Sequence, residues 1–175
     1  MQSYNHMIGT VLDGRYTLIG IIGIGGMAVV FSAHDRKTGD TVAVKMLRDD
    51  LDEGGALPHL RAQFANEARA LSELSHPGVV KFYGSHLDKP PYYFVMEYVE
   101  SITFKEYLEK KKILPAREVI DFSMQILSAL AHIHSKEIVH CDIKPHNVLL
   151  MKNGKIKITD FGIARTLPSA CSGET

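Results

Sequence analysis

Apolar residues in the first half of the chain cluster in the manner of β-strands. Runs rich in Val, Ile, Phe and Tyr occupy 16–23, 28–34 and 41–47, and the turn-forming segment DRKTGD separates the last two. β-Branched and aromatic residues favour strands, whereas Gly, Asp and Thr clusters between such runs mark turns. Because the connections are short, the pattern predicts an antiparallel meander.

A helical period follows. Apolar side chains recur every three or four residues at Leu57, Leu60, Phe64, Ala68, Leu71 and Leu74. This spacing predicts an amphipathic helix over 58–74, with Pro58 tolerated in its first turn and HPG at 76–78 ending it. Two further apolar runs, 79–86 and 92–99, predict strands joined by the loop DKPP.

The second half of the chain has a mainly helical pattern. Residues 103–112 predict a short exposed helix, and Pro115 opens a longer one that extends to 134. One face of the longer helix carries Val119, Phe122, Ile126, Leu130 and Ile133. Further on, IVH predicts a short strand. Apolar runs at 148–151 and 155–159 flank the turn KNG and predict a β-hairpin.

Composition favours a soluble protein without a strong electrostatic partner. The chain has 175 residues, of which 20 are basic and 20 acidic, so no broad field draws it to nucleic acid or an anionic membrane. We expect no signal peptide at the start, and the longest apolar run, 19–30, is too short to span a bilayer. Cys141 and Cys171 cannot form a disulfide framework, which favours a reducing, cytoplasmic location.

Several short motifs carry candidate chemistry. They are GIGGMA at 23–28, VAVK ending at Lys45, Glu67 in NEARAL, HCDIKPHN at 140–147 and DFG at 160–162. Glycines let backbone N–H groups approach phosphate oxygens because no Cβ intervenes. An inward-facing lysine needs a counter-charge, which a helix glutamate provides. Taken alone, however, the first three have ordinary explanations, which are a plain hairpin, a lysine in solvent and a surface glutamate.

The segment HCDIKPHN at 140–147 is the most specific of these motifs. A hairpin between Asn147 and Asp160 brings these two residues close together, so we expect their side-chain oxygens to lie near the Asp142 carboxylate. Such donors suit Mg²⁺. Zinc is the competing interpretation, because His132, His134, His140, Cys141 and His146 are close in sequence. Positions 132 and 134 do not face each other on a helix, which argues against a zinc site.

Together these motifs resemble the protein kinase family. GRY before the glycine-rich turn, GGM inside it and HPGVV after the helix are similar to bacterial serine/threonine kinases. The resemblance implies an α+β, bilobal fold, with a five-stranded antiparallel N-lobe sheet, one αC-type helix and an incomplete, mainly helical C-lobe. It further implies an N-terminal extension at 1–15, an N-lobe at 16–97, a hinge at 98–101 and a partial C-lobe at 102–175 that ends in the activation loop.

The resemblance also implies the reaction, which is transfer of the ATP γ-phosphate to serine or threonine hydroxyls of a protein. Asp142 would orient the hydroxyl and accept its proton, and Lys144 would balance charge at the γ-phosphate. Asn147 and Asp160 would hold Mg²⁺. The nucleotide positions that the resemblance implies are Ile22, Gly23, Gly25, Gly26, Val30, Ala43, Lys45, Glu67, Met96, Glu97, Val99 and Leu149. A hydrophobic spine would comprise Leu71, Phe82, His140 and Phe161.

The chain departs from the family pattern at two positions. Ala28 replaces the third glycine, which adds one methyl group that we expect to be tolerated. Cys141 stands where many kinases have an arginine that pairs with a phosphorylated activation loop, a contact that a thiol cannot make. Asp142 beside it disfavours the thiolate, so we expect an unreactive cysteine and catalysis not gated by phosphate docking there. Possible phosphorylation sites are Thr166, Ser169, Ser172 and Thr175.

Kinases of this family continue with a substrate-docking segment and several more helices. We therefore expect either a fragment of a longer kinase or a natural truncation, in which the apolar faces of helix 115–134 and of the loop strands are partly uncovered and open to aggregation or a partner. Two other functions stay open. One is an ATP-binding pseudokinase-like regulatory module. The other is a small-molecule phosphotransferase of related fold, whose loop H-x-D-x-H-x-x-N has a histidine where Lys144 stands.

Overall fold

The computed structural model describes residues 4–48, 50 and 57–166, and the chain divides into two compact units. The first comprises Met1–Ala68 and Lys81–Val99, and the second comprises Arg69–Val80 and Glu100–Thr175. Within the described residues, none of the helices combines the length and apolar content needed to cross a bilayer.

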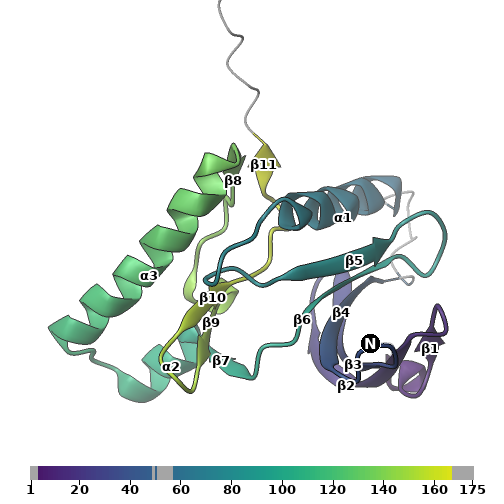
Figure 1. Cartoon of the computed structure of the whole chain (residues 1–175), viewed down its shortest axis with the longest axis horizontal. Helices are drawn as coiled ribbons and strands as arrows, with labels where there is room; N and C mark the ends of the chain where they lie inside the picture. Colours follow the sequence, from purple (N-terminus) through teal and green to yellow (C-terminus); the bar gives the residue numbers. More distant parts are fainter. Residues whose placement is uncertain (1–3, 49, 51–56, 167–175) are drawn as a thin grey trace, which may run out of the picture. The chain divides into compact units, whose positions relative to one another are not determined.

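The first unit is built on an antiparallel sheet with the strand order β1-β2-β3-β4-β6-β5 (Figure 1). A 3-10 helix, η1 (Tyr4–Met7), precedes β1. The strands are β1 (Val11–Leu12), β2 (Tyr16–Ile24), β3 (Ala28–Asp35), β4 (Thr41–Leu47), β5 (Phe82–His86) and β6 (Tyr93–Glu97).

The predicted antiparallel sheet is confirmed, but the predicted count of five strands was wrong. The sixth strand is β1, in which Val11 pairs with Thr17 and Leu12 with Tyr16. Two residues are too few to produce a period-two pattern, so this strand has no signal in the sequence. Its position places part of the predicted N-terminal extension inside the sheet.

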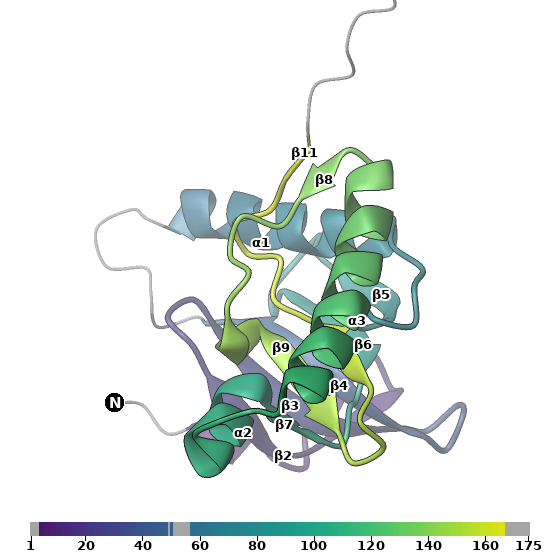
Figure 2. The ribbon, with the colours of Figure 1, turned by 90° about the vertical axis from the view of Figure 1, so that its left-hand side faces the viewer.

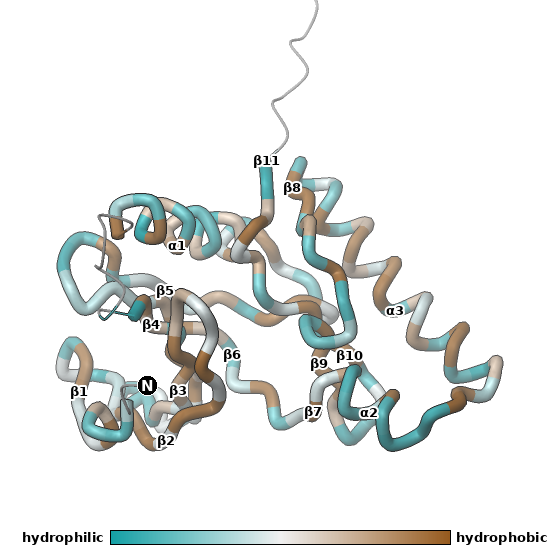
Figure 3. Tube along the Cα trace, turned by 180° about the vertical axis from the view of Figure 1, so that it is seen from behind, coloured by the Kyte–Doolittle hydropathy of each residue, from teal (hydrophilic) through white to brown (hydrophobic). Residues whose placement is uncertain are grey.

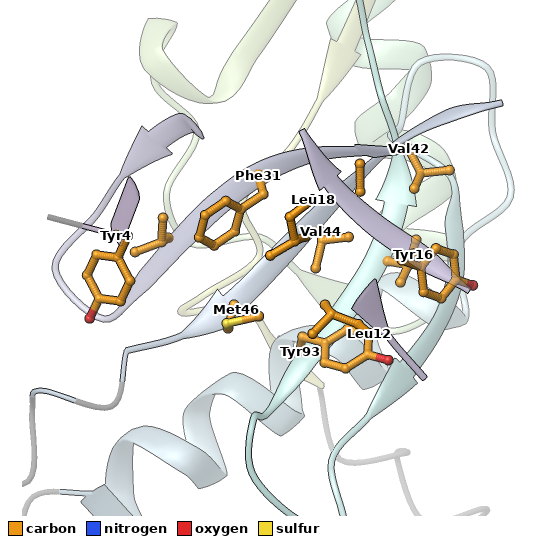
Figure 4. Packing of buried hydrophobic residues seen from close by; sticks show 12 residues of the cluster. Tyr4, Leu12, Tyr16, Leu18, Phe31, Val42, Val44, Met46 and Tyr93 are labelled. Carbon is orange, nitrogen blue, oxygen red and sulfur yellow. The ribbon is translucent and has the colours of Figure 1, made fainter. Parts of the chain in front are cut away.

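The core of the first unit lies against one face of this sheet. Alternate residues of β3 point into it, and Phe31 and Ala33 are completely buried, as expected for a strand whose side chains alternate between faces. Figure 4 shows Phe31 near Leu18 and Val44, with Tyr4 at the edge of the cluster.

Helix α1 (Leu57–Ser72) covers the other side of β4 and β6. The ring of its Phe64 lies 5.1 Å from that of Phe94 in β6, centroid to centroid, and both side chains are completely buried. This second cover explains why every residue of β4 after Thr41 is buried, without the polar and apolar alternation of a sheet with one wet face.

The second unit combines helices with two small sheets. The helices are α2 (Phe104–Lys111), α3 (Ala116–Ser135) and the 3-10 helix η2 (Pro145–Asn147). One sheet has the order β10-β9-β7 and the other pairs β11 with β8. Their strands are β7 (Ser101–Thr103), β8 (Ile138–Val139), β9 (Val148–Met151), β10 (Ile156–Ile158) and β11 (Arg165–Thr166). The predicted hairpin is β9–β10, in which Val148 pairs with Ile158.

Helix α2 begins where its sequence supplies a capping box. The Glu106 N–H donates to Oγ1 of Thr103 at 3.2 Å, and the Thr103 N–H donates to the Glu106 carboxylate at 2.7 Å. These reciprocal bonds satisfy backbone donors that have no partner inside the helix.

Helix α3 lies beside the β9–β10 hairpin (Figure 2). Gln125 makes the connection: its Nε2 donates to the Gly154 carbonyl at 3.1 Å, and its Oε1 accepts the Ile156 N–H at 3.1 Å. Phe122, Ala129 and Ile133 are the buried side chains of the helix.

A second apolar stripe of α3 is exposed. Hydrophobic segments recur along the helix in Figure 3. The large apolar side chains of α3 that are about half exposed or more are Val119 (45%), Ile120 (61%), Met124 (63%) and Leu127 (59%). Val119 was predicted to share the face of Phe122 and Ile133, but it lies in the first turn of α3 and is largely exposed. The stripe is consistent with the uncovered apolar surface expected for this helix. What covers it stays a prediction.

Candidate active site

The predicted ion pair between β4 and α1 is present in the first unit. Nζ of Lys45 donates to Oε1 of Glu67 at 2.6 Å. The two side chains are only 10% and 3% exposed, and Nζ also lies 5.9 Å from the ring centroid of Phe94. Lys45 therefore faces inward, because α1 supplies the counter-charge that burial of an ammonium group requires.

The glycine-rich turn connects β2 and β3. The Gly25 N–H donates to the Ala28 carbonyl at 2.8 Å and closes the turn. A Cβ built on Gly23 or Gly26 meets nothing within 4 Å, and neither residue has a positive φ. The backbone conformation therefore does not demand glycine there. The missing side chains leave open space beside the main chain, which is what close approach of a phosphate requires.

The other predicted nucleotide positions of the first unit lie on its strands. Val30 pairs with Lys45, and Ala43 pairs with Met96 on the neighbouring strand. Ala43 and Met96 are buried, whereas Ile22 in β2 is 51% exposed. Glu97 ends β6, and its carboxylate accepts the Lys81 N–H at 3.2 Å. Val99 is the last residue of this unit.

In the second unit, the Asp142 carboxylate has two side-chain donors. Its Oδ2 accepts from Nζ of Lys144 at 2.6 Å and from Nδ2 of Asn147 at 2.9 Å. Nδ2 of Asn147 also donates to the Asp142 carbonyl at 2.9 Å. The Lys144 ammonium is the main reason that the pKa of Asp142 lies below its usual range. This carboxylate is therefore ionised at neutral pH and oriented to accept a hydrogen bond.

His140 connects this loop to the segment that precedes Asp160. Its Nδ1 accepts the Asp142 N–H at 3.2 Å, and its Nε2 lies 3.0 Å from the Thr159 carbonyl. Both contacts are satisfied by a neutral ring with its proton on Nε2. Burial lowers the pKa of His140, which favours that neutral form. The Thr159 N–H donates to the Asn147 carbonyl at 3.0 Å, so Asn147 is hydrogen-bonded to the residue before Asp160.

The donor set fits Mg²⁺ in kind. Nδ2 of Asn147 is occupied by Asp142, which leaves the amide oxygen as the group that can face a metal ion, and Asp160 contributes a carboxylate. Mg²⁺ prefers such oxygen ligands and retains water in its remaining positions. Asp160 has φ of 68°, a left-handed conformation that Asp tolerates better than most residues and that turns the chain after β10.

Cys141 is exposed, with φ of 63°, and its Sγ donates to the Val139 carbonyl at 3.4 Å. Left-handed backbone at a non-glycine residue is uncommon and concentrates at functional sites.

Leu149, the predicted nucleotide position of the second unit, lies in β9, paired with Lys157 and Thr103.

Members of the predicted spine make aromatic contacts within each unit, while the spine as a whole stays a prediction. The rings of His140 and Phe161 are 4.6 Å apart in the second unit, where Leu71 is also buried. In the first unit the ring of Phe82 lies 6.3 Å from that of Phe94.

The candidate zinc ligands take other contacts. Nε2 of His132 accepts the Ser75 N–H at 3.2 Å, and the His132 ring stacks on His76 at 5.3 Å. Among the residues that the structure describes, no group of three or more His, Cys, Asp or Glu side chains is arranged to hold a metal ion.

Of the predicted phosphorylation sites, Thr166 is exposed in β11, where it pairs with Ile138. Ser169, Ser172 and Thr175 lie outside the described residues, as does Cys171.

Sequence reasoning missed one residue near the glycine-rich turn, Arg48, whose side chain contacts the carbonyls of Gly25 and Gly26. An arginine three residues after a strand lysine carries no motif signal, so only the fold identifies it.

The sequence is similar to known proteins over nearly its whole length. Residues 16–174 match the family model described as Protein kinase domain. The chain is 44% identical over 163 residues to serine/threonine-protein kinase PrkC of Bacillus subtilis, covering 93% of this chain and 25% of that protein. It is 44% identical over 161 residues to the probable serine/threonine-protein kinase SCO3848 of Streptomyces coelicolor, covering 89% and 23%.

A third relative is the probable serine/threonine-protein kinase PknB of Lactococcus lactis, which is 39% identical over 169 residues and covers 96% of this chain and 26% of its own length. The chain thus spans about a quarter of the length of the curated relatives that it matches.

Proposed function

The chain belongs to the protein kinase family, and from this premise we propose that it transfers the γ-phosphate of Mg-ATP to serine or threonine hydroxyls of a protein substrate. The observation that carries the proposal is the Asp142 carboxylate, held by Lys144 and Asn147, with Asn147 bonded to the backbone beside Asp160.

The residues divide the chemistry between them. Asp142 accepts a hydrogen bond from the substrate hydroxyl, aims the oxygen at the γ-phosphorus and receives the proton as the new bond forms. Lys144 lies 2.6 Å from the same carboxylate, close enough to balance charge on the transferred phosphoryl group. Asn147 and Asp160 would hold Mg²⁺, which when bound neutralises phosphate charge.

The first unit supplies the phosphate contacts. Lys45, oriented by Glu67, would pair with the α- and β-phosphates, and the open space at Gly23 and Gly26 would let backbone N–H groups donate to phosphate oxygens. Val30, Ala43, Met96, Leu149 and the backbone of Glu97 to Val99 are the proposed adenine contacts. The assignment of residues 98–101 as a hinge stays a prediction.

The retained residues favour this function over the two alternatives. Lys45, Asp142, Asn147 and Asp160 are all present, so no substitution explains a pseudokinase. The bond from Lys144 to Asp142 supports a protein kinase over a small-molecule phosphotransferase. The same proposal has three further parts. A segment or a partner covers the exposed stripe of α3, the protein is cytoplasmic, and full activity requires further C-lobe structure.

The test is γ-phosphate transfer from labelled Mg-ATP to a generic basic protein and to the chain itself. Asp142→Asn should lose transfer but keep nucleotide binding, whereas Asp121→Asn, the same substitution at an exposed site on α3, should change neither. A version extended through further C-lobe helices, if the gene encodes them, belongs in the same assay. Nucleotide binding without transfer in both lengths would contradict the proposal and favour the pseudokinase alternative.

A further inference from the structure

Arg48 follows β4 and holds successive carbonyl groups of the glycine-rich turn. Its Nη1 donates to the carbonyls of Gly25 at 3.0 Å and Gly26 at 3.2 Å, and its backbone N–H donates to the carbonyl of Met27 at 2.9 Å. Arg48 therefore fixes the direction in which these three carbonyl groups of the turn point.

This arrangement determines where the amide groups of the turn point. In a planar trans peptide the N–H lies opposite the C=O. Because the carbonyls of Gly25 and Gly26 face the guanidinium, the N–H groups of Gly26 and Met27 point away from it. Successive N–H groups on one side of a turn form an anion-binding concavity. The side of the turn opposite Arg48 is thus prepared for phosphate oxygens.

Asp50 fixes the guanidinium in this orientation. Nε of Arg48 donates to Oδ1 of Asp50 at 2.9 Å, and Nη2 donates to Oδ2 at 2.7 Å. This two-point contact uses one edge of the planar fork and directs the remaining nitrogen, Nη1, at the turn. The bonds from Arg48, followed by the one from Tyr4, hold the pKa of Asp50 below its usual range.

Tyr4 completes the chain of contacts from the N-terminal segment. Its hydroxyl donates to Oδ1 of Asp50 at 2.6 Å. Tyr4 is 5% exposed and belongs to the core cluster of the first unit, and in Figure 4 its hydroxyl points away from Phe31. The core thereby sets the position of the hydroxyl. Tyr4 lies in η1, before residue 16, where the match to the kinase family model begins.

We propose that Tyr4, Asp50 and Arg48 form a positioning relay that orients the glycine-rich turn toward the phosphates of the nucleotide. The proposal rests on the function proposed above. It makes Arg48 a positioning residue, and it gives the segment before the family match a role in phosphate affinity.

The test compares two ligands in the full chain. Arg48→Lys keeps the positive charge but loses the fork, and it should weaken Mg-ATP binding about tenfold. Tyr4→Phe removes one oxygen and should weaken Mg-ATP binding about threefold, a smaller loss because the ion pair remains. Adenosine has no phosphate, so its affinity should change less than twofold in either variant. Arg15→Lys is the matched control, because Arg15 makes the same two-point contact with Asp35 at the opposite end of the β2–β3 hairpin.

Amide hydrogen exchange at Gly25, whose N–H donates to the Ala28 carbonyl at 2.8 Å and closes the turn, gives a second readout that needs no nucleotide. Exchange there should accelerate in Arg48→Lys and Tyr4→Phe and stay unchanged in Arg15→Lys. Faster exchange in these two variants, together with a wild-type chain that binds no ATP, would support the relay and contradict the proposed function. ATP binding with unchanged affinity and exchange in both variants, or equal losses for ATP and adenosine, would overturn the relay.

Discussion

Nζ of Lys45 and Oε1 of Glu67 are 2.6 Å apart between β4 and α1, and both side chains are buried. Removing two charges from water costs several kcal/mol each, and their attraction offsets this cost only while both are present. Two apolar side chains would pack in the same place without that cost. A role in binding phosphate, rather than stability, therefore accounts best for the pair.

Lys45→Met should reduce the free energy of unfolding by about 3 kcal/mol, because it leaves the Glu67 carboxylate buried without its counter-charge. Lys45→Met combined with Glu67→Leu should recover most of that loss, since no buried charge remains. Urea titrations of the wild type, both single variants and the double variant measure this coupling. Additive losses would show that the two side chains are not coupled. The recovered double variant should still bind Mg-ATP poorly.

Lys144→Met should lower the rate of phosphate transfer by roughly 10- to 100-fold, because the transferred phosphoryl group loses a nearby cation. The KM for ATP should change little, since Asn147 still holds the Asp142 carboxylate. Steady-state kinetics with varied ATP separate the two effects.

Lys152→Met is the matched control for this prediction. Lys152 pairs with Glu100 in the same unit, and both side chains are largely exposed, so its loss should leave transfer unchanged. Equal rates for Lys144→Met and Lys152→Met would remove Lys144 from the mechanism.

His76 and His132 form a stacked pair that joins the segment after α1 to α3. Nδ1 of His76 accepts the Gly78 N–H at 3.0 Å, and Nε2 of His132 accepts the Ser75 N–H at 3.2 Å. Protonation of Nδ1 of His76 removes the bond from Gly78. Burial is the main reason that the pKa of His76 is lowered, and the neighbouring His132 and Lys157 lower it further.

Because the folded chain resists protonation of His76, the unfolded chain binds more protons once the pH falls below the ordinary histidine pKa of about 6.5. The stability that the neutral ring contributes is present above that pH and is lost as the pH falls toward the lowered pKa of the folded state. The loss is limited to about 1.4 kcal/mol per pH unit for one group.

Urea unfolding at pH 7.5 and 5.5 should show this loss in the wild type and a smaller one in His76→Asn, whose amide oxygen replaces Nδ1 as acceptor but does not titrate. The remaining slope includes His140, whose pKa is also lowered. An identical pH dependence in the wild type and His76→Asn would refute this assignment.

The sequence was informative wherever a contact is local or carries a motif. The continuous apolar run of β4, the helical period of α1 and the KNG turn of the β9–β10 hairpin each depend on neighbouring residues, and all were predicted. The contacts of Arg48 and Tyr4 were not predicted, because they join residues far apart in the sequence: 23 positions separate Arg48 from Gly25, and 46 separate Tyr4 from Asp50. Likewise, the pairing of His76 with His132 spans 56 positions, from 76 to 132, and has no periodic signal.

We propose that the chain holds ATP through Mg²⁺ and Asp160. The most direct measurement is the Kd for ATP with Mg²⁺ and with a chelator, in the wild type and in Asp160→Asn, which keeps a residue tolerant of φ near 68° but loses the charge. We predict that Mg²⁺ tightens ATP binding about tenfold or more in the wild type and much less in Asp160→Asn. Equal affinity with Mg²⁺ and with the chelator in the wild type would contradict the account.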